Sequence, residues 1–245
     1  MQSQFDELAA LYEDMALWPF RKDIEIPNVL ALVGDIRGLS VLDFGCGTGM
    51  YSRLFKERGA KRVVGYDVAD GMIKYAKEQE EKNPVGIEFI SELTPTLENI
   101  FDLVVGVYVL PYAATHEELY TMCSTMAGLV KSGGRLITLP IHPEYDPNPK
   151  YYEPYGFRLI SDNPYTEGGK IQLELCYSNY DVKVTAYYWS SSILKAALIE
   201  AGFSSVEQIE LFTSSTGDLN KACSTLKNYI KKPHASILEC KKEKI

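Results

Sequence analysis

Three glycines at alternate positions, Gly45, Gly47 and Gly49, follow a short apolar run that ends in Asp43 and Phe44. A helical pattern begins directly afterwards, so the stretch predicts a strand, a tight turn and a helix. Glycine has no Cβ and tolerates positive φ, which lets a ligand approach the backbone closely. The first turn of the helix directs unpaired N–H groups toward the same point. The pattern therefore predicts a small-molecule site at the end of this strand.

The kind of ligand follows from two details of the turn. The dinucleotide fingerprint is G-x-G-x-x-G, but its sixth position here is Met50. A carboxylate at Asp43 would repel a pyrophosphate, and it suits a cationic ligand. S-adenosylmethionine (SAM) carries a sulfonium and an α-ammonium and has no phosphate. A glycine turn that binds no ligand is the simpler alternative.

The stretch resembles the first motif of the class I SAM-dependent methyltransferases, in which an acidic residue is followed by G-x-G-x-G. Fold, activity and cofactor are expectations that this resemblance implies. It assigns cofactor binding to Asp43, Gly45, Cys46, Gly47, Thr48 and Gly49. Cys46 is expected to be a small filler of the turn and not a nucleophile.

A second acidic residue, Asp67, ends the strand predicted over residues 61–66 and lies 18 residues beyond Gly49. A carboxylate there can accept hydrogen bonds from both ribose hydroxyls, in NAD and in SAM alike. We expect Val68 and Met72 to flank the adenine. By resemblance, Glu92 after the third strand faces the adenine amino group. Val107, at the end of the fourth strand, completes the expected cofactor site.

Strands are predicted at residues 41–44, 61–66, 87–90, 101–107, 135–141, 206–211 and 236–241, mostly alternating with helices. Such alternation predicts an α/β fold. We expect one Rossmann-like domain over residues 1–245, with a seven-stranded, mostly parallel sheet, helices on both faces and an antiparallel last strand. Leu219, Cys223, Leu226 and Ile230 mark a further helix, which we expect on the surface.

Two segments are expected to enclose the site. Residues 1–33 predict an N-terminal helical lid, in which Phe5 would contact the substrate and Tyr12 the cofactor. Residues 142–189 contain nine of the 17 tyrosines, and a β-hairpin is predicted from residues 171–177 and 182–189. We interpret this segment as a substrate cap. Alternatively, its aromatic residues only form a small core of its own.

The expected substrate-binding residues lie at the end of the fourth strand and in the cap. They are Phe5, Tyr108, Tyr112, His142, Tyr152, Tyr155 and Trp189. Methyl transfer is an in-line displacement that mainly needs alignment and desolvation. A general base helps only if the accepting atom is protonated. His142 and Tyr108 are the candidates, although a loop histidine without a chemical role is equally compatible with the position of His142.

Composition and charge narrow the class further. The chain of 245 residues has a net charge of −8, and proteins that coat nucleic acid are usually basic. No apolar run approaches the roughly 20 residues of a membrane helix, and no secretory signal is evident at Met1. We therefore expect no nucleic-acid or membrane partner, a cytoplasmic location, and a monomer or homodimer. The five cysteines suggest neither a metal site nor disulfides; they are Cys46, Cys123, Cys176, Cys223 and Cys240.

A narrower resemblance links the chain to the small N-methyltransferases of azapteridine (toxoflavin-type) biosynthesis. It is carried by Phe5-Asp6 to Glu13-Asp14, Gly34-Asp35, Tyr188-Trp189-Ser190 and Leu238 to Lys241. This resemblance implies a small aromatic or heterocyclic methyl acceptor, with nitrogen or oxygen as the accepting atom.

Three alternatives stay open. They are a nicotinamide-dependent oxidoreductase, against which Asp43 and Met50 argue, a catalytically silent SAM-binding protein, and a protein methyltransferase. The Asn-Pro-Pro-Tyr motif for amino groups of bases or of glutamine is missing, since the corresponding stretch is Val107-Tyr108-Val109-Leu110.

Overall fold

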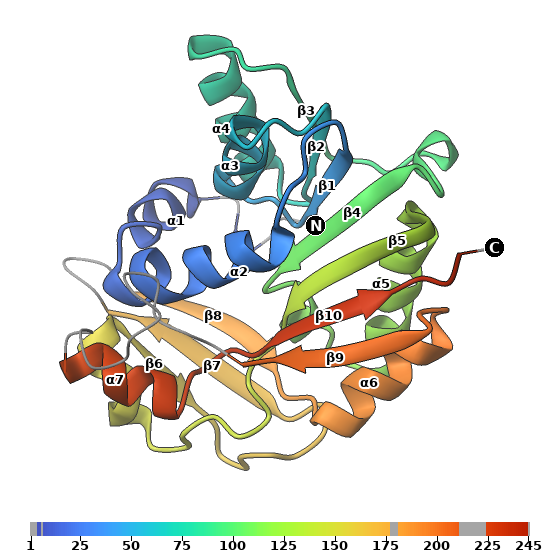
Figure 1. Ribbon diagram of the computed structural model, residues 1–245. Helices are drawn as coiled ribbons and strands as arrows, with labels where there is room; N and C mark the ends of the chain where they lie inside the picture. Colours follow the sequence, from blue (N-terminus) through green and yellow to red (C-terminus); the bar gives the residue numbers. More distant parts are fainter. Residues whose placement is uncertain (1–3, 6, 177–180, 211–223, 245) are drawn as a thin grey trace.

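A seven-stranded sheet forms the centre of the computed structural model, which describes residues 4, 5, 7–176, 181–210 and 224–244. The strands lie in the order β3-β2-β1-β4-β5-β10-β9 (Figure 1). They are β1 (Ser40–Phe44), β2 (Arg62–Tyr66), β3 (Ile87–Ile90), β4 (Phe101–Val107), β5 (Val130–Leu139), β9 (Ser205–Ile209) and β10 (Ile237–Lys241). Strands β1 to β5 pair in parallel, and β10 is antiparallel to both of its neighbours. The predicted Rossmann-like sheet is confirmed.

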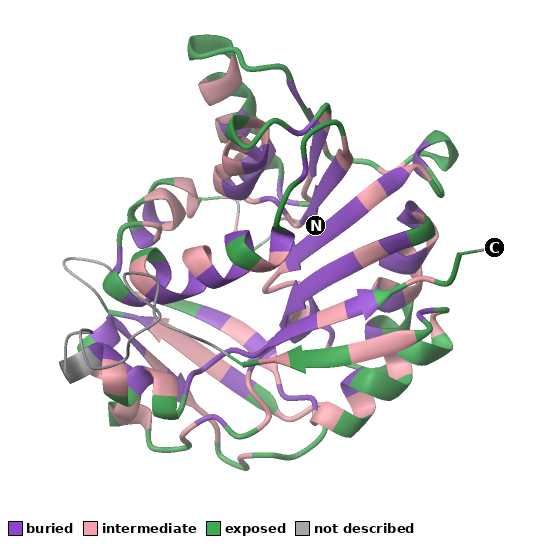
Figure 2. Ribbon diagram, viewed as in Figure 1, coloured by how far each residue is buried: buried purple, intermediate pink, exposed green. Residues whose placement is uncertain are grey.

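Helices cover both faces of this sheet, because its central strands are apolar on both sides. Helices α2 (Ile26–Val33), α3 (Met50–Glu57) and α4 (Asp70–Lys82) pack on one face. Helices α5 (His116–Leu129) and α6 (Ser191–Glu200) pack on the other, beside the short turn η2 (Pro95–Leu97). Figure 2 shows the buried strands between these layers.

The boundary between α5 and β5 differs from the prediction. The helix ends at Leu129, and β5 begins at Val130, five residues before the predicted start at Arg135. Gly133, with φ of 72°, lies inside the strand where the pairing with β4 is irregular. The Gly133-Gly134 pair is therefore an irregularity within the strand and not the signal that stops the helix.

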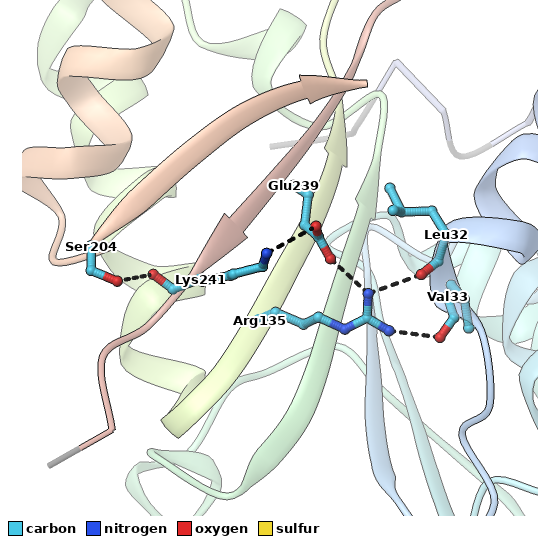
Figure 3. Close-up of polar contacts among 6 residues, drawn as sticks. All are labelled: Leu32, Val33, Arg135, Ser204, Glu239 and Lys241. Atoms are coloured by element: carbon cyan, nitrogen blue, oxygen red, sulfur yellow. Dashed lines mark hydrogen bonds and ion pairs between the residues drawn. The ribbon is translucent and has the colours of Figure 1, made fainter. Parts of the chain in front are cut away.

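The N-terminal segment forms α1 (Ala9–Met15), a π-helical turn η1 (Arg21–Glu25), and α2. Arg135 of β5 anchors the end of α2 to the sheet (Figure 3). Its guanidinium donates hydrogen bonds to the carbonyl oxygens of Leu32 and Val33, at 2.9 and 2.6 Å, and to Glu239 at 2.7 Å. These carbonyls lack partners within the helix. The contact therefore holds the N-terminal segment in a defined position above the sheet.

Between β5 and α6 the chain forms η4 (Pro149–Tyr155) and a second, antiparallel sheet of β6 (Phe157–Ile160), β7 (Lys170–Leu175) and β8 (Val182–Tyr187). The predicted hairpin corresponds to β7 and β8, and β6 is a strand that the sequence pattern did not indicate. Three residues of the predicted turn, Ser178, Asn179 and Tyr180, lie outside the described residues. Figure 1 shows this sheet below α1 and α2, at the end of the large sheet toward which β4 and β5 point.

Besides the two hydrophobic clusters on the faces of the large sheet, the small sheet and the N-terminal segment form a third cluster. It also contains Leu226 and Tyr229 of α7 (Ser224–Lys231). Tyr229 is only 2% exposed. The helix that was expected on the surface packs this apolar face into the cluster, while Asn228 and Lys231 stay exposed. Leu219 and Cys223, also expected in that helix, lie outside the described residues.

Candidate functional site

A cavity of about 330 Å³ opens at the carboxyl ends of β1, β2 and β4, below α1 and η1. This edge is where open parallel sheets bind ligands, since β2 and β4 flank β1 and their connections diverge. The volume lies at the lower end of the range of small-molecule pockets. Its wall combines backbone and side chains from several distant parts of the chain.

The glycine turn forms the floor. The backbone N–H groups of Gly45 and Cys46 donate to the carbonyl oxygen of Tyr66, at 2.7 and 2.9 Å. Gly47 has a φ of 53°, and a Cβ built there meets no atom within 4 Å. That space is open for a ligand to approach the backbone, as the sequence pattern predicts.

Gly49 serves the turn in another way. It has a φ of 83°, and a Cβ on it would lie 2.6 Å from the ring of Phe89. It is buried and is not part of the cavity wall. The expected role in cofactor binding is therefore corrected to a packing role, since the third glycine lets α3 begin against β3.

Asp67 links the two loops that border the cavity. One carboxylate oxygen accepts from the N–H of Gly47 at 2.8 Å, and the other accepts from the N–H of Ala69 at 2.9 Å. The carboxylate faces the cavity, where it can accept hydrogen bonds from the hydroxyls of a ligand. Val68 and Met72, on the same loop and helix, also line the cavity. This arrangement can receive a vicinal diol next to an apolar ring.

Asp43 lies at the end of β1 and is 2% exposed. Its carboxylate accepts a hydrogen bond of 2.6 Å from the hydroxyl of Ser52. Burial raises the pKa of Asp43 to about 7, although the bond from Ser52 opposes this. A cation in the cavity would favour the ionised form.

Neighbouring residues stabilise the turn. Thr48 and Cys46 line the cavity, and burial raises the pKa of the Cys46 thiol well above its ordinary value, so this thiol is not a nucleophile. Arg53 of α3 donates to the carbonyl oxygen of Thr48 at 2.8 Å and to Glu13 of α1 at 2.7 Å. The N-terminal segment is thereby attached to the glycine turn.

An aromatic group closes the cavity from above. The ring of Phe5 lies 4.9 Å from that of Tyr112 and 6.0 Å from that of Tyr12, both in edge-to-face contact. Burial raises the pKa of Tyr12 to about 12 and that of Tyr112 well above its ordinary value. Tyr112 belongs to the short turn η3 (Leu110–Tyr112) that follows β4.

A buried polar network borders the cavity below η1. Arg21 pairs with Glu25 at 3.0 Å, and Glu25 also accepts hydrogen bonds from Tyr51, at 3.1 Å, and from Tyr108. Tyr108 has a φ of 57°, which is rare for a residue with a bulky side chain. Backbone strain of this kind clusters at functional sites. Sequence reasoning singled out Tyr108 but missed Arg21 and Glu25.

In total, nine residues of the cavity wall were not predicted as site residues. They are Arg21, Phe44, Met50, Tyr51, Tyr66 and Val109 around the sheet edge, with Thr121, Met122 and Thr125 from α5. Met122 belongs to the apolar face of α5, most of which packs into the core, and it also lines the cavity. The spacing of residues along a helix shows which side chains share a face. It does not show whether that face meets packed core or an open cavity.

Four of the predicted site residues lie outside the cavity wall. Trp189 is 3% exposed, and its indole N–H donates to the carbonyl oxygen of Ala113 at 3.0 Å, within the core between α5 and the sheet. Tyr152 and Tyr155 are buried in the third cluster, where Tyr155 contacts the ring of Tyr229. Glu92 is exposed outside the cavity wall. These positions are corrections to the expected substrate and adenine contacts.

The two general-base candidates are also corrected. His142 is half-buried outside the cavity wall, where its Nδ1 accepts from the N–H of Glu144 at 3.0 Å, and burial lowers its pKa. Tyr108 does line the cavity together with Val107. However, burial and then Glu25 raise the pKa of Tyr108 well above its ordinary value. Its hydroxyl, which already donates to Glu25, is therefore a poor proton acceptor.

Among the described residues, no group of three or more histidine, cysteine, aspartate or glutamate side chains could hold a metal ion. Within those ranges, none of the helices combines the length and the apolar character that crossing a bilayer requires.

Comparison with known proteins adds the family context. Residues 41–134 match the family model described as a methyltransferase domain. An uncharacterized protein of Haemophilus influenzae is 31% identical over 150 residues, which are 56% of this chain and 57% of that protein. Ribosomal protein L11 methyltransferase of Burkholderia multivorans is 35% identical over 100 residues, or 40% of this chain and 31% of the enzyme. The chain thus spans between a third and three fifths of these relatives.

Solved structures share the fold over most of the chain. A SAM-dependent methyltransferase of Mesorhizobium loti matches with a TM-score of 0.62 and 20% identity, covering 89% of this chain and 97% of that one. Magnesium protoporphyrin IX methyltransferase of Synechocystis, solved with bound S-adenosylhomocysteine (SAH), matches with a TM-score of 0.55 and 21% identity, covering 89% and 81%. Residues 41–134 therefore match a methyltransferase domain by sequence, and most of the chain shares the fold of these solved methyltransferases.

Proposed function

We propose that this protein is a SAM-dependent methyltransferase that transfers a methyl group to a small aromatic or heterocyclic metabolite, at a nitrogen or oxygen atom. The observation that carries the proposal is the cavity itself. Asp43, Asp67 and the open space at Gly47 lie on one wall, opposite the aromatic residues of the lid. The matched methyltransferase domain contains the first wall.

The residues of the first wall fit the cofactor. Buried Asp43 suits the α-ammonium, because burial raises its pKa and a cation in the cavity would favour its ionised form. Asp67 lines the cavity, and its carboxylate can accept hydrogen bonds from the ribose hydroxyls. Val68 and Met72 supply apolar contacts for the adenine. When bound, SAM supplies an activated methyl group on a sulfonium.

The chain's own contribution to the reaction is to align the acceptor and to exclude water. Phe5, Tyr12 and Tyr112 enclose the cavity from the side of the lid. They offer flat aromatic surfaces to an aromatic acceptor. Among the described wall residues, no histidine is present, and burial raises the pKa values of Tyr12 and Tyr108. The acceptor atom therefore attacks with a lone pair that it already has at neutral pH.

A protein acceptor is the main competing function. The relative named ribosomal protein L11 methyltransferase favours it, although this chain covers only 31% of that enzyme. The contact of Phe5 with Tyr112 argues for a small acceptor, because an extended polypeptide needs an open groove. The remaining alternative is a SAM-binding protein without catalytic activity, which would bind the cofactor but transfer no methyl group.

The test has two stages. Isothermal titration calorimetry measures SAH binding to the purified protein, and absence of binding would refute the cofactor assignment. Labelled methyl from SAM is then offered to a metabolite extract and, separately, to a macromolecular fraction. We expect label in a small aromatic product, identified by mass spectrometry. If label appears only in protein, the acceptor is a protein and not a small molecule. If SAH binds but no methyl group is transferred, the result favours a SAM-binding protein without catalytic activity.

A further inference from the structure

Glu25 is a buried carboxylate that joins three parts of the chain behind the cavity wall. It belongs to η1 and is 4% exposed. It accepts hydrogen bonds from Arg21 of the same turn at 3.0 Å, from Tyr51 of α3 at 3.1 Å, and from Tyr108 after β4. These three partners line the cavity, and Glu25 lies behind them. It can therefore act on a bound ligand only through the side chains that it holds.

Tyr108 occupies the corner at which the chain leaves the large sheet. Its φ of 57° is a conformation that a bulky residue adopts only at a cost in free energy. Its N–H still donates to the carbonyl oxygen of Leu139 at 3.1 Å, which continues the pairing of β4 with β5. The turn η3 follows directly, and there the N–H of Tyr112 donates to the carbonyl oxygen of Val109 at 3.0 Å. The backbone angles of Tyr108 therefore set the direction in which η3 leaves the sheet.

Side-chain contacts hold Tyr108 in this conformation. Its ring stacks on that of His234, with 5.5 Å between the centroids and 29° between the planes. The guanidinium carbon of Arg21 lies 6.0 Å from the ring centre. Both contacts tolerate lateral shifts of the ring, whereas the hydrogen bond to Glu25 is directional and is strengthened by the charge of its acceptor. This bond therefore fixes the hydroxyl end of the side chain.

The aromatic side of the cavity depends on this corner. Tyr112 of η3 lies 4.9 Å from the ring of Phe5, and this pair closes the cavity toward the lid. The other wall contains Asp43 and Asp67, which come from β1 and from the loop after β2. A displaced corner would therefore change the spacing between Tyr112 and Phe5 and leave the two carboxylates in place. A misplacement of about 1 Å in groups that align a substrate can cost about 100-fold in rate.

We propose that Glu25 is a positioning residue for the methyl acceptor. Through the hydroxyl of Tyr108, it holds the corner after β4 so that Tyr112 and Phe5 enclose the acceptor in a fixed orientation. This role rests on the proposed function, because it concerns the acceptor side of the same cavity. Loss of this one hydrogen bond should therefore disturb η3 and the use of the acceptor, while the affinity for the cofactor stays the same.

Tyr108→Phe removes the hydroxyl, keeps the ring and leaves the ion pair of Glu25 in place. Amide hydrogen exchange of the purified protein without ligand, followed by mass spectrometry, reports on the corner through the N–H groups of Tyr112 and Ala113, which are hydrogen-bonded in this turn. We expect peptides that cover residues 109–113 to exchange about 5- to 30-fold faster, as for the loss of a hydrogen bond to a charged group. Peptides that cover the glycine turn should not change.

Further variants make the result specific to this bond. Tyr51→Phe removes the other tyrosine hydrogen bond to the same carboxylate, and it should leave exchange over residues 109–113 unchanged. Glu25→Gln keeps a neutral oxygen that can accept from Tyr108, so its exchange should lie between the wild type and Tyr108→Phe. If Glu25 acts through Tyr108, the double variant Glu25→Gln/Tyr108→Phe exchanges no faster than Tyr108→Phe.

Methyl transfer tests the role itself. Rates are measured with labelled SAM at rising amounts of the metabolite extract, and SAH affinity is measured by calorimetry. We expect Tyr108→Phe to need at least about fivefold more extract for the half-maximal rate, because the acceptor is held less well. Its SAH affinity should change by less than about threefold. A residue that only stabilised the fold would not separate these two quantities.

Unchanged exchange over residues 109–113 in Tyr108→Phe would overturn the proposal, as would equal acceleration in Tyr51→Phe. A loss of SAH affinity as large as the change in extract requirement would show that the corner serves the cofactor, which also refutes it. If the wild type transfers no label, the proposed function fails, while the exchange data still decide whether Glu25 holds the corner. Faster exchange confined to this corner, together with a selective change in extract requirement, supports the proposal.

Discussion

Replacing Asp43 by asparagine is expected to stabilise the free protein at alkaline pH while it weakens cofactor binding. The buried carboxyl has a pKa of about 7 in the folded chain, against an ordinary value of 3.8. The folded state therefore binds more protons than the unfolded state between these two values. By linkage, stability is lost as pH rises through this window, and the full penalty applies above about pH 7. Asparagine has nearly the same shape and no charge to bury.

The magnitude follows from the difference between the two pKa values. It is about three pH units, and each unit corresponds to about 1.4 kcal/mol. The full penalty in the wild type is therefore about 4 kcal/mol. Part of this penalty is already present at pH 5. We therefore expect the difference in free energy of unfolding between Asp43→Asn and the wild type to grow by about 3 kcal/mol, in favour of the variant, from pH 5 to pH 8.

Urea denaturation of both proteins at pH 5, 6, 7 and 8, without ligand, measures this gain. Asp102→Asn is the matched control. Although burial opposes it, the hydrogen bonds from Lys131 and Ser40 lower the pKa of Asp102. Asp102 is therefore ionised in both folded and unfolded chains over this range. The control should lose stability by an amount that does not change from pH 5 to pH 8.

A difference between wild type and Asp43→Asn that stays constant over this range would refute the reasoning, since Asp43 would then ionise as an ordinary surface carboxyl does. The second part is tested with ligand. At pH 8, SAH binding to Asp43→Asn should be about 10- to 100-fold weaker, because the ammonium loses its carboxylate. If Asp43→Asn binds SAH as tightly as the wild type does, the α-ammonium does not contact Asp43.

Three further substitutions separate binding from packing. Gly49→Ala should lower the free energy of unfolding by about 1–3 kcal/mol in urea denaturation, since its Cβ would lie 2.6 Å from the ring of Phe89. An unchanged midpoint would contradict that contact. Asp67→Ala should weaken SAH binding at least about tenfold by calorimetry, because it removes the ribose acceptor and the hydrogen bond from Gly47. An unchanged affinity would exclude Asp67 from the site. Trp189→Phe should destabilise the fold by about 1–3 kcal/mol through its lost indole hydrogen bond, with SAH affinity unchanged. A loss of affinity would show that Trp189 does contribute to the site.

The amino-acid sequence predicted the features that depend on short-range rules. The turn at Gly45 and Gly47 follows from the need for positive φ next to a buried strand. Asp43 and Asp67 end neighbouring parallel strands, so their meeting at one edge of the sheet follows from the topology. The capping box at the start of α5 also follows from local spacing, and Glu118 does donate its N–H to the hydroxyl of Thr115 at 3.1 Å.

The positions of the aromatic residues do not follow from such short-range rules. Tyr12 and Tyr112 line the cavity, whereas Tyr152 and Tyr155 fill a core cluster with α7. All four are tyrosines that were expected to contact the cofactor or the substrate. Which surface a tyrosine covers depends on partners far away in the chain, and the composition of its own segment does not contain that information.

Arg21 illustrates the same limit for charge. In the sequence it is one basic residue among 25, beside a proline and two aromatic residues. Only the folded chain buries it, pairs it with Glu25 and directs it to the cavity bordered by Asp43. Local sequence determined the glycine turn and the acidic strand ends, because backbone geometry and strand order are short-range or topological properties. The tertiary structure decided which charges and rings face the ligand, because burial is settled only when distant segments pack together.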